Sequence, residues 1–169
     1  MKHFLTIISC LAFFNMNSQN EPISAFLEKW NNSKAYLIDI AKAMPEEAYS
    51  FKPTEREMTF AQQLLHIKEN MDWLSTSYFS LEKYQNSKDI NVYTKAEIIA
   101  MLAISFNNVA LKVSKASKKD LSKKVDFFAG PKTKLQILNL LQDHVTHHRG
   151  QIIVYLNLKD VAPPKYVGW

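Results

Sequence analysis

A capping-box spacing occurs three times in this 169-residue chain, each time directly before an apolar stripe. In this spacing a threonine is followed three residues later by glutamate or glutamine, and the two side chains cap the first turn of a helix. The three pairs are Thr59 with Gln62, Thr94 with Glu97, and Thr133 with Gln136. Apolar residues then recur at steps of three and four, the period of a helix with one buried face. We therefore predict three amphipathic helices that begin at these threonines.

A fourth helix is predicted near the start of the chain, from Pro22 up to Pro45. Proline is favoured in the first turn of a helix, and it ends the pattern at the other end because it cannot continue a helix interior. The last capped helix is expected to run to about Lys159, ahead of Pro163 and Pro164.

Two of the connections between these helices have a recognisable character. One irregular turn is expected over residues 46–51, whereas the lysine-rich segment 114–132 is expected to be a loop, briefly extended over 124–128. Only three glycines occur, which argues against a sheet built from tight hairpins. Four amphipathic helices must bury their stripes against one another, so residues 20–169 are predicted to form a single all-α domain, a four-helix bundle.

The N-terminal segment has a different character. Lys2 precedes an apolar run over residues 4–14, and a polar stretch follows. This is the pattern of a secretory signal peptide, and the run is too short to span a bilayer. We expect residues 1–19 to be cleaved near Ser18 or Gln19, which predicts a periplasmic or secreted protein with no transmembrane segment.

Cys10 leaves two other localisations open. Its context resembles a bacterial lipoprotein signal, so the chain is alternatively lipid-anchored at Cys10, or it is cytoplasmic if no export occurs. Cys10 is the only cysteine, so a chain cleaved after it has no thiolate ligand or disulfide. Any metal must then be held by nitrogen and oxygen atoms. Loss of Lys2 would also lower the formal net charge from +5 to +4.

The basic composition does not indicate a nucleic-acid-binding protein. Only two arginines occur, Arg56 and Arg149, and no basic face interleaved with aromatic residues is visible. The main cluster of lysines falls in the predicted loop: Lys115, Lys118, Lys119, Lys123 and Lys124. We interpret it as solvated loop and expect no nucleic-acid partner.

The histidines are the most informative residues for function. His144 and His148 are four residues apart on the last predicted helix, at or near its apolar sector, whereas His147 lies towards the flank. A pair at this spacing can present two imidazoles to one metal ion. His66 lies on the flank of the second apolar stripe and could supply a third nitrogen. The alternative is that these are ordinary core histidines, which would then need partners for their buried polar edges.

Three neutral imidazoles favour zinc, nickel, iron or copper over magnesium or calcium, which prefer oxygen ligands. With three protein ligands the ion keeps open positions, as in catalytic zinc sites, and can lower the pKa of water or activate a thiolate. Ligation requires neutral imidazoles, and an ordinary histidine has a pKa of about 6.5. Protonation of the ligands therefore predicts loss of the metal at about pH 5.

The segment 143–151, Asp-His-Val-Thr-His-His-Arg-Gly-Gln, resembles the C-terminal H-x-x-H-H-R-G-Q signature of the DinB/YfiT-like superfamily. Residues 51–53 and 59–73 resemble that family's second-helix region with its first histidine. The likeness covers about residues 22–169. It implies a four-helix bundle of up-down-down-up type and frequent homodimers.

The resemblance also implies a metal-binding triad, which falls on His66, His144 and His148. Zinc or nickel are the ions it implies first, with iron or manganese as alternatives. Members include metal-dependent hydrolases and thiol-dependent transferases or isomerases, so the expected functions are a hydrolase, an S-transferase or isomerase, or a non-catalytic metal-stabilised binding module. The expected substrate is a small molecule of unknown identity. An export signal argues against the hypothesis of a thiol-dependent transferase, because low-molecular-weight thiol cofactors are cytosolic.

Supporting roles are assigned to residues near the histidines. Glu69 and Asp143 are candidates for catalytic proton acceptors or for orienting a histidine, and a solvated helix face is the competing interpretation. Arg149 is expected either to pair with an acidic residue such as Glu69 or to lie on the surface. Gly150 is expected to permit a close approach of two helices, because glycine otherwise destabilises a helix interior.

Overall fold

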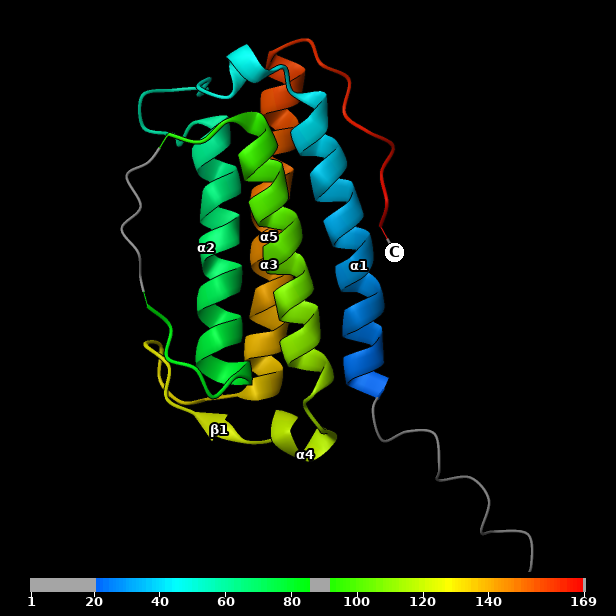
Figure 1. Cartoon of the computed structure of the whole chain (residues 1–169), viewed down its shortest axis with the longest axis vertical. Helices are drawn as coiled ribbons and strands as arrows, with labels where there is room; N and C mark the ends of the chain where they lie inside the picture. Colours follow the sequence, from blue (N-terminus) through cyan, green and yellow to red (C-terminus); the bar gives the residue numbers. More distant parts are fainter. Residues whose placement is uncertain (1–20, 86–91, 169) are drawn as a thin grey trace, which may run out of the picture.

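The computed structural model describes residues 21–85 and 92–168. Its four long helices are α1 (Glu21–Ala43), α2 (Phe60–Phe79), α3 (Lys95–Ser114) and α5 (Lys134–Leu158). Figure 1 shows α1 and α5 running in one direction and α2 and α3 in the other, which is the up-down-down-up arrangement. α3 and α5 each pack against both α1 and α2. The predicted all-α four-helix bundle is therefore confirmed, whereas the predicted signal peptide and cleavage site lie outside the described residues.

The three predicted capping boxes all form. In each, the threonine hydroxyl accepts a hydrogen bond from a backbone N–H, and the glutamine or glutamate accepts one from the threonine N–H. A fourth box, absent from the sequence-based prediction, pairs Ser117 with Asp120 and starts the short helix α4 (Lys118–Leu121). Leu121 is buried, so part of the predicted lysine-rich loop is folded onto the bundle.

Short irregular elements complete the connections. The 3-10 turn η1 (Glu46–Ala48) confirms the turn predicted after the first helix. β1 (Lys124–Val125) pairs with β2 (Lys132–Thr133) in an antiparallel ladder between α4 and α5. Only the start of the predicted extended segment is thus a strand. Gly130 reverses the chain with a φ of 85°, a left-handed conformation that glycine adopts without strain.

The core is filled by the inward stripes of the four long helices. Trp30 of α1 is fully buried and stacks on Phe26, with ring centroids 5.1 Å apart. Its indole N–H donates a 3.0 Å hydrogen bond to the carbonyl oxygen of Phe106 on α3. This bond satisfies the one polar atom of a large apolar side chain and ties α1 to α3.

α3 is the most apolar helix of the bundle. Its length and mean hydropathy of 1.5 would be compatible with a membrane span, a criterion that core helices of bundles also meet. One face of α3 is buried against α1 and α2, whereas Ile104 and Leu111 on the other side are each 58% exposed.

Candidate metal centre

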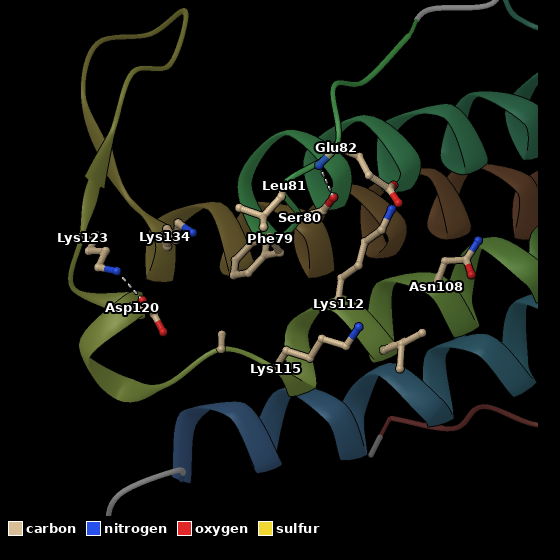
Figure 2. A pocket seen from close by; sticks show the side chains of 12 residues that line it. Phe79, Ser80, Leu81, Glu82, Asn108, Lys112, Lys115, Asp120, Lys123 and Lys134 are labelled. Atoms are coloured by element: carbon tan, nitrogen blue, oxygen red, sulfur yellow. Dashed lines mark hydrogen bonds and ion pairs between the residues drawn. The ribbon is translucent and has the colours of Figure 1, made fainter.

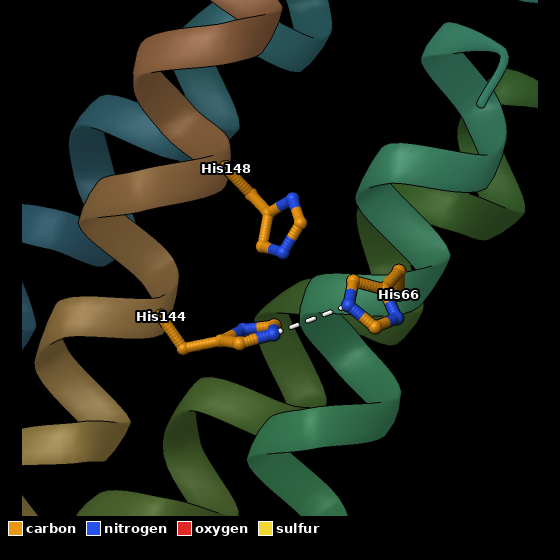
Figure 3. A group of neighbouring side chains, drawn as sticks. All are labelled: His66, His144 and His148. Carbon is orange, nitrogen blue, oxygen red and sulfur yellow. Dashed lines mark hydrogen bonds between the residues drawn. The ribbon is translucent and has the colours of Figure 1, made fainter. Parts of the chain in front are cut away.

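The three histidines predicted as ligands lie together between α2 and α5. His66 comes from α2, and His144 and His148 come from successive turns of α5 (Figure 3). Each offers one ring nitrogen, and these three nitrogens all lie within 4.8 Å of one another. The Nε2 atoms of His66 and His144 are 3.2 Å apart. Three nearby imidazoles of this kind could hold a metal ion.

The packing of α2 against α5 explains why the rings meet. Residues four apart on a helix lie above one another on one face, so His144 and His148 both face α2. His148 is buried, whereas His66 and His144 are half-buried. The cluster is therefore set into the bundle, with His148 as its most buried member.

Hydrogen bonds fix the orientation of the His148 ring. Its Nδ1 atom lies 2.7 Å from Oε1 of Gln63 and 3.0 Å from Oε1 of Gln151. Amide oxygens only accept, so Nδ1 carries the proton and Nε2 keeps a free lone pair. Gln63 is itself oriented by Tyr155, because its amide donates to the tyrosine oxygen at 3.3 Å. The tyrosine hydroxyl in turn donates to the carbonyl of Met58 at 2.9 Å.

The separation between His66 and His144 fits a shared ion. Two nitrogens bound at about 2.0–2.1 Å to a tetrahedral zinc lie about 3.3 Å apart, close to the 3.2 Å that separates these Nε2 atoms. A proton shared between the two rings would give a similar distance. However, Nδ1 of His144 is buried without a hydrogen-bond partner within the described part of the chain. The network that orients His148 thus has no counterpart at His144.

His144 and His148 are neutral at physiological pH. The pKa of His144 is lowered to about 3, mainly by burial and then by the neighbouring His148, His66 and His147. The pKa of His148 is lowered to about 4, again mainly by burial and then by His66 and His147, with Gln151 opposing the shift. Neutral imidazole is the form that ligates metals, so the site is poised to bind a cation.

The acidic candidates lie outside this arrangement. Glu69 and Asp143 are exposed, and within residues 21–85 and 92–168 neither hydrogen bonds to a histidine of the triad. Amides rather than carboxylates orient His148. A catalytic role for either acid stays a prediction. His147 is exposed and is not part of the three-histidine cluster.

Arg149 lies on a different face of α5 from the one predicted. It is 5% exposed, its guanidinium lies 5.2 Å from the ring centroid of Tyr36, and it donates to Ser33 Oγ at 3.4 Å. Both alternatives expected for Arg149, pairing with Glu69 and a surface position, are therefore wrong, because this position of α5 is buried and faces α1 rather than α2. The expected close approach at Gly150 is also wrong, since a Cβ built there meets nothing within 4 Å.

The orienting glutamines are the functional residues that sequence reasoning missed. Gln63 precedes His66 by three residues, and Gln151 follows His148 by three. Residues three apart are neighbours on a helix surface, so each glutamine lies one turn from a triad histidine. Metal-bound histidines commonly donate their second N–H to a polar partner. The three-residue spacing could therefore have been used to predict that these glutamines orient a histidine.

Comparisons with known proteins agree with the fold and with the family resemblance. A family model described as the DinB family matches residues 16–167. The uncharacterized protein YjoA of Bacillus subtilis strain 168 is 23% identical over 151 residues, which span 83% of this chain and 90% of that protein.

Two solved structures are similar in fold. A DinB-like protein from Bacillus cereus ATCC 10987 has a TM-score of 0.75 at 22% identity, covering 90% of this chain and 100% of that one. The crystal structure of the DinB-like YjoA of Bacillus subtilis has a TM-score of 0.68 at 19% identity, covering 87% and 96%. At these identities the likeness establishes the fold.

Proposed function

This chain belongs to the DinB family, and on that premise we propose that it is a metal-dependent hydrolase whose ion is held by His66, His144 and His148. The main support for this proposal is that three imidazole nitrogens lie within 4.8 Å of one another. Within the described residues no carboxylate or thiolate completes the set, so the site would leave positions open. Zinc or nickel suits such a nitrogen donor set better than magnesium or calcium.

The protein's own residues would define the geometry of such a site. Gln63 and Gln151 hold the proton of His148 on Nδ1 and direct Nε2 towards the other two rings. A divalent ion bound here supplies Lewis acidity, which can activate water at neutral pH. Because His66 and His144 are half-buried, a small molecule could reach the open side, which supports a catalytic site over a sealed structural one.

The proposed hydrolase can be tested with purified protein loaded with zinc or nickel. We expect slow hydrolysis of a simple activated ester such as p-nitrophenyl acetate, dependent on the metal and abolished in His144→Ala. Activity that requires an added thiol would instead identify a transferase. A metal-loaded protein that cleaves neither p-nitrophenyl acetate nor p-nitrophenyl phosphate above the rate of His144→Ala would contradict the hydrolase proposal.

A further inference from the structure

A second candidate site lies at the end of the bundle where α2 and α3 finish and α5 begins. It is a pocket of about 780 Å³, a size in the range of small-molecule sites (Figure 2). Phe79 in this pocket and His66 in the metal centre are 13 residues apart on α2, which corresponds to about 20 Å along the helix. The pocket is therefore separate from the metal centre.

The pocket combines an apolar lining with an excess of positive charge. Phe79, Leu111 and Ala116 supply apolar surface. Four lysines and two carboxylates also line it: Lys112, Lys115, Lys123, Lys134, Asp120 and Glu82. Four cations against two anions leave a formal charge of +2, which would attract an anionic ligand.

Most of this positive charge is not neutralised by a neighbouring carboxylate. Lys123 forms an ion pair with Asp120 at 2.5 Å. Lys112 donates instead to the neutral hydroxyl of Thr76 at 2.7 Å. Among the residues that the structure describes, Lys115 and Lys134 have no carboxylate within ion-pair distance.

Helix dipoles explain only part of the lysine cluster. α2 and α3 both end here, and the carbonyl end of each helix carries about half a negative charge, which a lysine such as Lys112 in the last turn stabilises. Lys134 is the first residue of α5, where the same dipole disfavours a cation. Its Nζ lies 5.6 Å from the ring centroid of Phe79, so the charge is held directly over the apolar lining.

We propose that this pocket binds an organic anion, consisting of an apolar chain or ring that carries one carboxylate, sulfonate or phosphate group. The apolar part would pack on Phe79, Leu111 and Ala116. The anionic group would be attracted by the charges of Lys115 and Lys134, the two lysines of the lining that lack a carboxylate partner. A short-chain carboxylate such as octanoate has both features and serves as the probe.

Isothermal titration calorimetry with octanoate, octan-1-ol and sodium sulfate tests this assignment. We expect octanoate to bind one per chain, with octanol and sulfate binding at least tenfold more weakly. The double variant Lys115→Gln/Lys134→Gln should weaken octanoate binding at least tenfold. The matched control, Lys118→Gln/Lys119→Gln, loses the same charge from exposed residues of α4 outside the pocket lining and should bind as the wild type does.

Several outcomes would overturn the proposal. Octanol binding as tightly as octanoate would show an apolar patch without anion recognition, and equal weakening in both double variants would show a diffuse charge effect. Sedimentation with vesicles containing phosphatidylglycerol, without binding of soluble octanoate, would identify a membrane-docking surface instead. Thermal melting verifies the folding of each variant. If the double variant is unfolded, the exposed single change Lys115→Gln should still weaken binding at least threefold, and an unchanged affinity would reject the site.

Discussion

Nδ1 of His148 on α5 lies 2.7 Å from Oε1 of Gln63 on α2, next to the three-histidine cluster. The contact determines which ring nitrogen carries the proton, and it joins the two helices that supply all three imidazoles. Gln63 is 1% exposed and is oriented through Tyr155, so the arrangement is set by the core of the bundle.

Replacing this glutamine should weaken metal binding without removing a ligand. In Gln63→Leu the N–H of His148 keeps only Gln151 as an acceptor, and we expect zinc affinity to fall about tenfold, approaching about 100-fold when Gln151→Leu is added. A competition titration against a chromogenic chelator measures this. Gln85→Leu, at an exposed position after α2, is the control and should not change affinity. An unaltered zinc affinity in the double variant would show that the glutamines do not orient a ligand.

The pH dependence of metal affinity should be shallow. The lowered pKa values of His144 and His148, about 3 and about 4, keep both imidazoles neutral between pH 6.5 and 5. At most one of the three ligands can then take up a proton, so affinity should fall by no more than about thirtyfold over this interval. Three ordinary histidines would lose metal more steeply, as the sequence alone predicts. Zinc dissociation constants measured at several pH values distinguish the shallow from the steep dependence. Release of two or three protons for each zinc ion bound would contradict the argument that burial keeps His144 and His148 neutral.

Gly150 offers a stability test of the exposed face of α5. A Cβ there meets nothing within 4 Å, so Gly150→Ala should stabilise the protein by about 0.5–1 kcal/mol through helix propensity. The melting temperature should rise by about 1–4 °C. Gly130→Ala should do the opposite, because its φ of 85° is strained for alanine. A fall in melting temperature for Gly150→Ala would mean that another surface, such as a second copy of the chain, packs on this face.

The parts of the structure that depend on local spacing could be predicted from the sequence. Thr59, Thr94 and Thr133 cap their helices as predicted, because a capping box involves residues only three apart. His144 and His148 share a face for the same reason, since four residues make about one helical turn.

The parts that depend on which helix covers which flank could not be predicted. The apolar stripe of α5 does not show that Arg149 faces α1, where its guanidinium lies over Tyr36. The role of Gln63 requires knowing that α2 packs on α5 with Tyr155 behind it. Likewise, Lys115 and Lys134 line one pocket only because α3 ends where α5 begins.

Metal analysis of purified protein tests the three-histidine site most directly. After saturation with zinc and removal of free ion, plasma mass spectrometry should find one zinc per chain in the wild type and in His147→Ala. Less than a tenth of that should remain in His66→Ala and in His144→Ala, because each loses one of three converging nitrogens. A full equivalent of zinc retained by both of these variants, or none bound by the wild type, would contradict the account.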